Sequence, residues 1–187
     1  MLLKYFPDKE MEICEKAVQF LRCGKLIIYP TDTVYGLGAD ATNPEAVEAA
    51  YKLKQRPRGQ PLSALAADLK MLLKLARATP EQEKILSARL PGPYTFILPP
   101  RKSMPVANGN VGFRLPNHWC CRISKFLGRP ITATSSNIHN QTTPASIKEL
   151  EKIFGDKVAL YIDAGPLSGK PSQVVDLTTA EPTTVRE

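Results

Sequence analysis

Hydrophobic positions along the chain follow two spacings in turn, one typical of helices and the other typical of strands. Residues 10–23 carry apolar side chains three and four apart and end at Gly24, so they predict a helix with one buried face. The apolar run 26–29 that follows predicts a buried strand. The same patterns predict a helix at 44–53 after the cap residue Asn43, another at 68–75, and a third that begins with a capping box at Thr79-Pro80. Two more helices are predicted, one from Asn117 to a stop at Gly128 and one from Thr143-Pro144 to a stop at Gly155. Further strands are predicted at 61–67, 94–98, 111–115, 130–135, 158–164 and 172–178, with a short final strand at 183–186 that pairs with the one before it.

Helices and strands therefore alternate over the whole chain, without an internal repeat, a low-complexity tract or an obvious linker. This order predicts the α/β class, as a single domain over residues 1–187 with a twisted, mixed parallel and antiparallel sheet flanked by helices. Several of the 17 prolines stand at predicted strand ends. We therefore expect stiff loops along the rim of the sheet, where α/β domains usually bind their ligands.

The composition is that of a globular protein, with 43% hydrophobic and 23% charged residues. The net charge of +7 favours an anionic partner such as a nucleic acid or a nucleotide, although a solvated cationic surface explains it equally well. The four cysteines form no CxxC pair and the two histidines have no metal-ligand spacing, so we expect reduced thiols, a cytoplasmic location and no metal ligands from the protein. No N-terminal stretch resembles a signal peptide and no apolar run approaches ~18 residues, so we expect no membrane contact.

The stretch "KLIIYPTDTVYGLGADAT", residues 25–42, raises the first question about function. After its buried strand come three small polar residues and then Gly36 and Gly38, which suggests that another group approaches the backbone closely. The stretch is not a dinucleotide loop, because the third glycine of that motif is missing. The segment "GPLSGKPS", residues 165–172, is not a phosphate loop either, since only three residues separate its glycines and Pro171 stands where a helix would begin. A bound nucleotide would need another kind of site.

Cations cluster in "KLKQRPRGQPL", residues 52–62, at the end of a predicted helix. In one interpretation they cap the C-terminus of that helix. In the other, Lys54 and Arg56 project beyond the helix, from which Pro57 forces the chain, and grip one polyanion from two sides. An arginine fork and a lysine point charge together suit a triphosphate. Side chains that project in this way can be truncated with little loss of stability.

Two further strand ends carry polar groups. The strand 131–133 leads into residues 134–137, Thr-Ser-Ser-Asn, which are either turn residues or positioned donors for a carboxylate, a ribose or a base. Arg114 stands in the otherwise apolar segment "VGFRLPNH". This arginine either has an anionic partner on a buried face or lies on a solvated face.

Taken in order along the chain, these segments resemble the YrdC-like family of threonylcarbamoyl-AMP synthases. The resemblance runs from about residue 10 to 186 and rests on seven motifs: "YPTDTVYGLG", "KQR" followed by "PL", "LPGPYTFIL", "GFRLPNH", "ATSSN", "DAGPLSGKPSQVVDLT" and the terminal "TVR". It implies an α/β fold with a large open basic cleft. It also implies a reaction in which L-threonine, bicarbonate and ATP give threonylcarbamoyl-adenylate and pyrophosphate. A tRNA threonylcarbamoyl transferase complex would then use the adenylate on tRNAs that read ANN codons, and binding of tRNA or double-stranded RNA is a further implication.

The resemblance also implies, position by position, which side chains contact each substrate. The positions that bind threonine in the family are matched by Thr33, Arg114, Ser135 and Ser172. The positions in contact with ATP are matched by Lys54, Arg56, Asn137 and Arg186. The side chains expected to carry catalysis are Lys54, Arg56, Ser135 and Asn137. Mg²⁺ is expected through the ATP phosphates, and Gly36 and Gly38 are expected to keep their loop thin beside the bound amino acid.

The chain departs from the family pattern at Leu65, Ile138-His139 and Gln173, all of which bear on the contacts to threonine. Two other interpretations stay open. One is a module that binds RNA in the same cleft without chemistry, and the other is a paralogue that acts on a different carbamoyl or adenylate substrate. The pairing of Lys54 and Arg56 with a hydroxyl and amide cluster favours the synthase, because an RNA binder needs cations alone.

Overall fold

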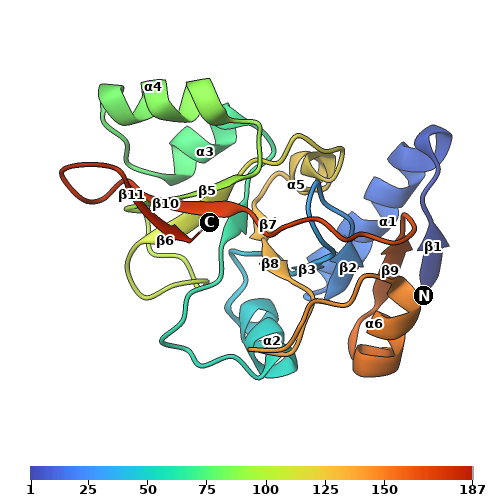
Figure 1. The fold of residues 1–187 in the computed structure, drawn as a ribbon. Coiled ribbons are helices and arrows are strands. Elements are labelled where there is room, and N and C mark those ends of the chain that lie inside the picture. The colour runs from blue at the N-terminus through green and yellow to red at the C-terminus, as the bar shows by residue number, and fades with distance from the viewer. Residues whose placement is uncertain (187) are drawn as a thin grey trace.

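The strands form two sheets in the computed structural model, which describes residues 1–186 (Figure 1). The five-stranded sheet has the order β1 (Leu2–Lys4), β9 (Leu160–Asp163), β2 (Ile27–Tyr29), β3 (Gly36–Gly38) and β8 (Thr134–Ser135). The six-stranded sheet has the order β11 (Thr183–Arg186), β10 (Gln173–Asp176), β5 (Tyr94–Leu98), β6 (Val111–Arg114), β4 (Ala64–Leu65) and β7 (Ile131–Thr132). Both sheets mix parallel and antiparallel pairs, since β2 is parallel to β9 and antiparallel to β3, while β5 is parallel to β10 and antiparallel to β6. The α/β class with mixed pairing is confirmed.

The strands are divided between two sheets, where a single sheet was expected, because segment 130–135 does not form one strand. Its first half, β7, pairs with β4 of the six-stranded sheet, and its second half, β8, pairs with β3 of the five-stranded sheet. Between them, Ala133 donates its backbone N–H to the carbonyl of Ser63 at 2.7 Å. The two sheets therefore meet where this segment changes partners.

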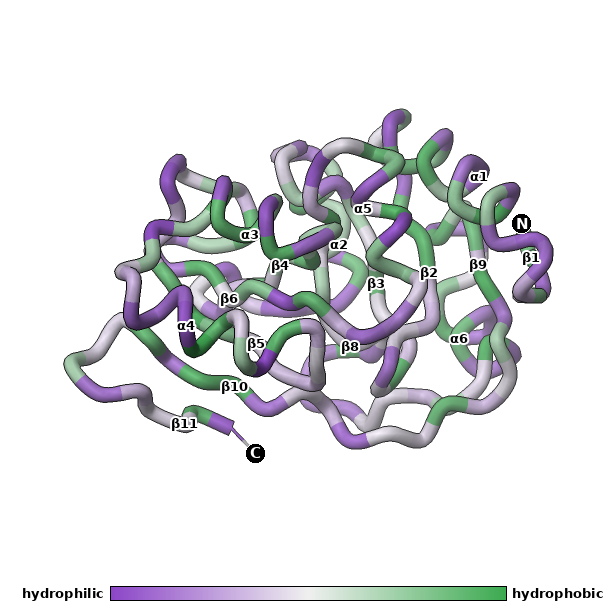
Figure 2. The backbone as a smooth tube through the Cα atoms, turned by 90° about the horizontal axis from the view of Figure 1, so that it is seen from above, coloured by the Kyte–Doolittle hydropathy of each residue, from purple (hydrophilic) through white to green (hydrophobic). Residues whose placement is uncertain are grey.

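Six α-helices flank the sheets within the described residues: α1 (Glu10–Arg22), α2 (Pro44–Lys54), α3 (Leu69–Leu75), α4 (Pro80–Arg89), α5 (Cys121–Leu127) and α6 (Ile147–Phe154). The short 3₁₀ helices η1 (Pro7–Lys9) and η2 (Gly155–Lys157) precede α1 and follow α6. Helices α1 and α6 lie on opposite sides of the five-stranded sheet, and α3 and α4 lie beside the six-stranded sheet (Figures 1 and 2). Strands β2 and β9 run hydrophobic between their helices (green in Figure 2), as strands covered on both faces do.

Two of the predicted helix starts are confirmed by their caps. The Asn43 side chain accepts the backbone N–H groups of Glu45 at 2.9 Å and Ala46 at 3.2 Å, and α2 begins at Pro44. Thr79 forms the predicted capping box with Gln82 at the start of α4. In both cases the cap satisfies backbone N–H groups that the first helical turn leaves unpaired.

Two other predicted starts are wrong. Asn117 lies in a turn, and α5 begins only at Cys121, without a side-chain cap. Helix α6 begins at Ile147 rather than at Thr143-Pro144, because Ser146 forms a capping box with Glu149. The predicted helix stops are confirmed, since Gly128 and Gly155 take positive φ angles of 73° and 53° at the helix ends.

The two glycines of the opening stretch make room for a tyrosine, so the expectation that they thin a substrate loop is wrong. Gly36 and Gly38 belong to β3 and pair with Tyr29 and Ile27 of β2. A Cβ at Gly36 would lie 2.8 Å from the ring of Tyr29, and a Cβ at Gly38 would lie 2.8 Å from a side-chain carbon of Ile27. The Tyr29 hydroxyl reaches past them and donates to the carbonyl of Thr132 at 2.8 Å.

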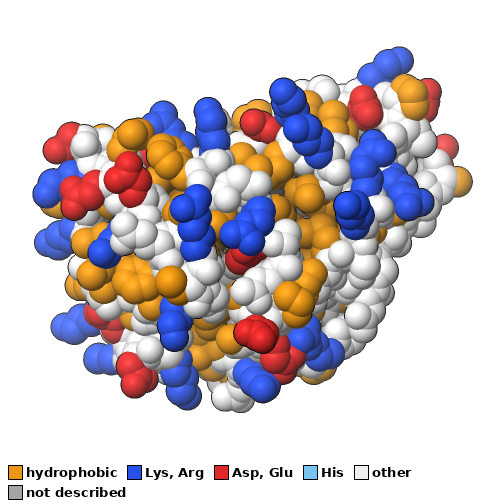
Figure 3. Space-filling model, turned by 180° about the vertical axis from the view of Figure 1, so that it is seen from behind, with side chains coloured by type: hydrophobic (Ala, Val, Ile, Leu, Met, Phe, Trp, Pro, Cys, Tyr) orange, Lys and Arg blue, Asp and Glu red, His pale blue; other side chains and the backbone are white. Residues whose placement is uncertain are grey.

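The surface charge is spread rather than gathered on the face shown in Figure 3. Lysine and arginine side chains are scattered over that face, with aspartate and glutamate among them. Elsewhere too, cations lie beside acidic groups, as in the exposed pair Lys52–Glu48, at 3.7 Å, and in the pair of exposed Arg122 with half-buried Glu10, at 2.8 Å. A solvated cationic surface therefore accounts for part of the net charge.

Neither the cysteines nor the helices conflict with the expectations drawn from the composition. Cys14 is fully buried in the core, and the four cysteines are free. Over residues 1–186, no helix has both the length and the apolar character that a membrane crossing requires.

Candidate functional site

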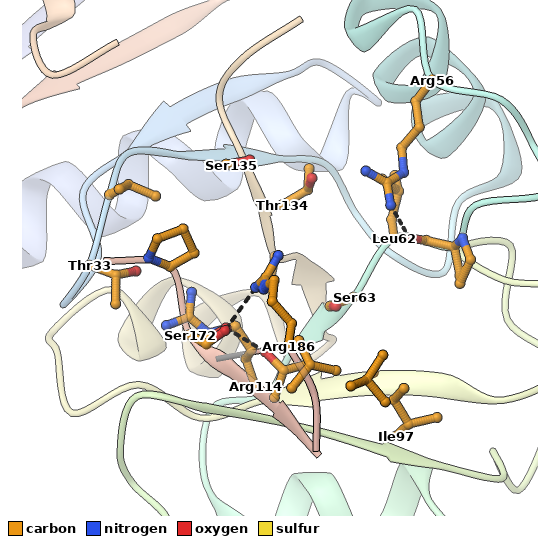
Figure 4. A pocket seen from close by; sticks show the side chains of 18 residues that line it. Thr33, Arg56, Leu62, Ser63, Ile97, Arg114, Thr134, Ser135, Ser172 and Arg186 are labelled. Atoms are coloured by element: carbon orange, nitrogen blue, oxygen red, sulfur yellow. Dashed lines mark hydrogen bonds between the residues drawn. The ribbon is translucent and has the colours of Figure 1, made fainter. Parts of the chain in front are cut away.

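A hollow of about 320 Å³ opens between the two sheets, beside the point where β7 passes into β8. This volume falls at the lower end of the range of small-molecule sites. Six of the eight side chains predicted from the sequence line it: Thr33, Arg56, Arg114, Ser135, Ser172 and Arg186 (Figure 4). The other two, Lys54 and Asn137, lie behind Ser135 and do not line the hollow.

Lys54 is a buried residue, so the expectation that its side chain projects from the end of α2 is wrong. Only 1% of the residue is exposed. Its ammonium group donates to the carbonyl of Ser135, to the carbonyl of Asn137 at 2.8 Å and to the Asn137 side-chain oxygen at 3.2 Å. The Ser135 hydroxyl donates to the same Asn137 oxygen at 2.6 Å. Lys54 thus fastens segment 135–137 to the end of α2, and its removal would leave buried acceptors unpaired.

The surroundings of Lys54 destabilise its charged form. Burial lowers the pKa of the Lys54 ammonium to about 7, and the nearby Arg56 guanidinium acts in the same direction. Its three acceptors are neutral carbonyl and amide oxygens, which stabilise a cation less than a carboxylate does. An anion bound next to segment 135–137 would therefore favour the protonated form.

Arg56 points into the hollow from the loop that follows α2. The helix ends before Pro57 can break it, because Gln55 already turns the chain with a left-handed φ of 51°. The Arg56 guanidinium donates from Nε to the carbonyl of Gln60 at 2.9 Å and from Nη2 to the carbonyl of Pro61 at 3.2 Å. The loop thus fixes one edge of the guanidinium. Because Lys54 does not line the hollow, Lys54 and Arg56 do not both face it, and the expected grip from two sides is wrong.

Arg114 lies on a buried face with an anionic partner, which excludes the solvated-face interpretation. The residue is 7% exposed on β6, and its Nη2 donates to Asp32 Oδ1 at 2.8 Å. Its Nε is also buried and has no partner among residues 1–186. A buried unpaired donor on a charged group is costly unless a ligand fills the position. The guanidinium is thus anchored on one side by Asp32 and has unused donor capacity.

Hydroxyl groups from both sheets surround this arginine. Thr33, in the loop after β2, contacts Thr31 through their hydroxyl oxygens at 3.0 Å. Thr95, on β5, contacts Ser172 in the same way at 2.7 Å. The Ser172 carbonyl in turn accepts a hydrogen bond of 2.8 Å from Arg186 Nη2 (Figure 4). These contacts hold the hydroxyls in place beside the guanidiniums.

Three arginines thus share the hollow, and no aspartate or glutamate is among the described residues that line it. Burial lowers the pKa of Arg186, and the neighbouring Arg114 adds to that effect. Burial also lowers the pKa of Arg56, and Arg186 acts in the same direction. An anionic ligand bound between these like charges would reduce their mutual repulsion.

Sequence reasoning missed several residues of this site. Asp32 was not assigned as the partner of Arg114, and Ser63, Thr95 and Gly112 were not singled out although they line the hollow. Strand alternation carries a signal for two of them. Thr95 lies opposite Arg114 in the register of β5 and β6, and Gly112 lies two residues before Arg114 on the same face.

Of the departures from the family pattern, Leu65 is fully buried on β4 and does not line the hollow. His139 uses its backbone N–H to bond the carbonyl of Lys54 at 2.8 Å. Gln173 donates its backbone N–H to Pro93 at 3.0 Å, next to Ser172. Of these positions, only Gln173 is adjacent in the chain to a predicted site residue that lines the hollow, namely Ser172.

Comparison with known proteins gives a family and several relatives. The family model Sua5_yciO_yrdC, described as "Telomere recombination", matches residues 19–187. A threonylcarbamoyl-AMP synthase of Pyrococcus abyssi is 37% identical over 177 residues, which cover 91% of this chain and 52% of that protein. A threonylcarbamoyl-AMP synthase of Vibrio parahaemolyticus is 33% identical over 183 residues, which cover 91% of this chain and 97% of that protein.

Two of the solved structures that match the whole chain illustrate its relation to longer and similar-sized proteins. The crystal structure of P. abyssi Sua5 complexed with L-threonine has a TM-score of 0.89 at 33% identity, and 56% of it is covered. The crystal structure of E. coli YciO has a TM-score of 0.88 at 27% identity, and 94% of it is covered. The chain therefore spans about half the length of the P. abyssi relative and nearly all of the Vibrio and E. coli proteins. On the family match and these identities, the chain belongs to the Sua5/YciO/YrdC family.

Proposed function

We propose that this protein synthesises threonylcarbamoyl-AMP from L-threonine, bicarbonate and ATP. The observation that carries the proposal is that two kinds of anion-binding group face one hollow. A buried arginine with hydroxyls suits an amino acid, and two further arginines suit a polyphosphate. The relatives from P. abyssi and V. parahaemolyticus, both named threonylcarbamoyl-AMP synthase, support the same reaction.

The amino-acid part of the site is centred on Arg114. A carboxylate is the natural ligand for a guanidinium that is held at one end by Asp32 and has an unpaired buried Nε. The hydroxyls of Thr33 and Ser172 can exchange hydrogen bonds with the amine and the side-chain hydroxyl of threonine. That P. abyssi Sua5 was solved with L-threonine supports this choice of substrate.

The nucleotide part of the site is formed by Arg56 and Arg186, with ATP entering as its Mg²⁺ complex. Mg²⁺ prefers oxygen ligands and usually binds through substrate phosphates and a few waters. Within residues 1–186, no three side chains of the types His, Cys, Asp and Glu are grouped so that they could hold a metal. We propose that the phosphate oxygens of ATP bind the Mg²⁺ ion and that the arginines contact the remaining phosphate charge.

The reaction needs no protein nucleophile. Bicarbonate takes up a proton and loses water to give CO₂, while the threonine ammonium loses a proton to become an amine. The amine nitrogen then bonds to the carbon of CO₂, one C=O π pair moves onto oxygen, and loss of a second proton from nitrogen gives the carbamate. A carbamate oxygen then attacks the α-phosphorus of ATP, the bond to the bridging oxygen breaks, and pyrophosphate leaves with its charge. Both reactants are anions, so the arginines that line the hollow lower the barrier by offsetting repulsion and by stabilising the leaving group. Holding three reactants in one hollow supplies much of the rest.

Lys54 and Asn137 take a different part from the direct ATP contact that the family resemblance implied. Both act through Ser135, whose hydroxyl and carbonyl they fix by hydrogen bonds. Ser135 lines the hollow and would contact the reactants. Lys54 and Asn137 are therefore proposed as positioning residues, and Arg56 with Ser135 as the groups that touch substrate.

The test is pyrophosphate release by the purified chain with MgATP, bicarbonate and each amino acid in turn. We expect release only when L-threonine and bicarbonate are both present, and we expect Arg56→Ala to abolish most of it. Equal release with serine, or with no amino acid, would contradict the proposal and indicate a paralogue with another substrate. Absence of release together with tight binding of double-stranded RNA would indicate the binding module instead.

The proposed product also defines a downstream partner. Threonylcarbamoyl-AMP is a mixed anhydride, so an acceptor enzyme must use it before water does. A tRNA threonylcarbamoyl transferase complex in the cytoplasm is the partner that fits, and tRNA or double-stranded RNA would contact the dispersed cations of the surface. Retention of labelled product when the chain is mixed with such a complex would test this partnership.

A further inference from the structure

The loop that joins β9 to β10 crosses from one sheet to the other beside the hollow. This crossover loop, residues 164–172, contains the "GPLSGKPS" segment that is not a phosphate loop. Most of its residues are exposed, and its last two, Pro171 and Ser172, line the hollow. Two backbone contacts hold its middle: Leu167 donates to the carbonyl of Ala145 at 2.8 Å, and Gly169 donates to the carbonyl of Thr33 at 3.1 Å.

Gly169 lies closer to Thr33 than any other residue type could. A Cβ added at Gly169 would be 2.9 Å from the Cα and 3.0 Å from the carbonyl carbon of Thr33, and closer still to its carbonyl oxygen. All three are backbone atoms, so no side-chain rotation can relieve the contact. The requirement for glycine at this position therefore comes from close approach to Thr33.

The contact joins two parts of the amino-acid site that are far apart in the sequence. Thr33 belongs to the loop after β2, and Ser172 lies three residues beyond Gly169 in the crossover loop. Both side chains face the hollow, and Ser172 is itself tied to Thr95 at 2.7 Å. The spacing between the Thr33 and Ser172 hydroxyls thus depends on how closely the crossover loop lies on the Thr33 backbone.

We propose that Gly169 is a positioning residue for amino-acid binding, which sets the separation of Thr33 from Ser172 by allowing the crossover loop to lie on the Thr33 backbone. This inference rests on the proposed function, because it assigns the wall between Thr33 and Ser172 to threonine. Of the two nucleotide arginines, Arg56 is held by its own loop through Gln60 and Pro61 and does not depend on this contact. Arg186 donates to the Ser172 carbonyl, so a shift of the crossover loop should lower ATP affinity to a lesser extent. Disturbing Gly169 should affect threonine far more than ATP.

The matched variants are Gly169→Ala and Gly59→Ala. A Cβ at Gly59 meets nothing within 4 Å, so this variant controls for the general effect of replacing an exposed loop glycine. Binding of L-threonine and of MgATP would be titrated separately by calorimetry, without bicarbonate so that no turnover occurs. We expect Gly169→Ala to raise the threonine Kd by roughly ten-fold or more, the size expected when about one hydrogen bond to the ligand is lost, while the ATP Kd stays within about three-fold. Gly59→Ala should match the parent for both ligands.

A second variant guards against a Gly169→Ala chain that fails to fold. Insertion of one glycine after Lys170 leaves Gly169 against Thr33 but lengthens the link from that contact to Ser172, so it should also lower threonine affinity. Unchanged threonine affinity in either folded variant overturns the inference. Equal losses for threonine and ATP also overturn it, because the loop then supports the fold as a whole. A parent protein that binds MgATP but no threonine contradicts the proposed function itself, and the inference fails with it.

Discussion

Arg114 donates from Nη2 to Asp32 Oδ1 at 2.8 Å, while the buried Nε of the same guanidinium has no partner among residues 1–186. The pairing with Asp32 offsets the cost of burying the guanidinium, and the remaining donor capacity is what a substrate carboxylate needs. A strand arginine that is ambiguous in the sequence thus becomes the most specific feature of the hollow.

Replacing Arg114 with lysine should weaken threonine binding much more than ATP binding. A lysine keeps the charge and can still reach Asp32, but it cannot make the paired contact with a carboxylate. Loss of one charge-assisted contact corresponds to about 1.5–3 kcal/mol, or roughly a ten- to hundred-fold rise in the threonine Kd. Calorimetric titration with each ligand measures both effects.

Arg129→Lys is the matched control for that substitution. Arg129 also pairs with an aspartate, Asp40, at 2.7 Å, but it does not line the hollow. We expect this variant to bind threonine and ATP like the parent. If Arg114→Lys kept the parent's threonine affinity as well, the carboxylate would have to be placed elsewhere in the hollow.

Lys54 should give the free energy of unfolding a distinct dependence on pH. Burial lowers its pKa from 10.5 to about 7 in the folded protein, so between these values the unfolded chain holds a proton that the folded chain lacks. Stability from this group therefore rises as the pH rises from about 7 towards 10.5, by at most about 1.4 kcal/mol per pH unit. Below pH 7 the ammonium is charged in both states and its burial opposes folding.

Urea unfolding of Lys54→Met and the parent between pH 7 and 9.5 tests this assignment. The parent should gain stability relative to the variant as the pH rises, because the variant lacks the titrating group. Lys52→Met, in which the removed side chain is 77% exposed on the same helix, should follow the parent's pH dependence. A constant difference between Lys54→Met and the parent would mean that Lys54 titrates near its ordinary pKa.

Adding a methyl group at Gly36 should destabilise the protein. The new Cβ would lie 2.8 Å from the Tyr29 ring, which is fully buried and cannot move aside freely. Overpacking of this kind typically costs about 1–3 kcal/mol, so we expect Gly36→Ala to unfold at lower urea concentration than Gly59→Ala. If Gly36→Ala instead lost threonine affinity at full stability, the glycine would serve the substrate after all.

Much of the fold was predictable because its signals are local. Caps such as Asn43 and Thr79 depend on residues two or three positions away, and both were predicted correctly. The error at the start of α6 arose from competing local signals, since Pro144 favours a first turn while Ser146 and Glu149 form a capping box. In this protein α6 begins immediately after the Ser146 capping box and not at Pro144.

The site was predictable only in part, because its geometry depends on contacts between distant segments. The Arg114–Asp32 pair spans 82 positions of the sequence. The change of sheet at Ala133 was also invisible, because residues 130–135 alternate like a single strand. Likewise, the burial of Lys54 follows from where segment 135–137 folds back, and no spacing within α2 encodes that position.

The C-terminal strand offers the last prediction, because β11 carries Arg186 to the hollow. The strand pairs with β10 through Val174↔Arg186, Val175↔Thr184 and Asp176↔Thr183, as the sequence predicted. Arg186 Nη2 donates to the Ser172 carbonyl at 2.8 Å. All four residues of β11 are exposed, so the strand adds little buried surface to the fold. Its removal should therefore affect ligand binding more than stability.

We expect Arg186→Ala, and a chain that ends at Pro182, to raise the ATP Kd by roughly ten-fold or more, since each loses a charge-assisted phosphate contact. Both should melt within about 5 °C of the parent, because a loss of about 1 kcal/mol lowers Tm by only about 2–4 °C in a chain of this size. Thr184→Ala is the control on the same strand, since Thr184 faces a different hollow, beside Lys84 and Ile85. Parent-like ATP affinity in the shortened chain would remove Arg186 from the nucleotide site and leave Arg56 and Ser135 to hold the phosphates.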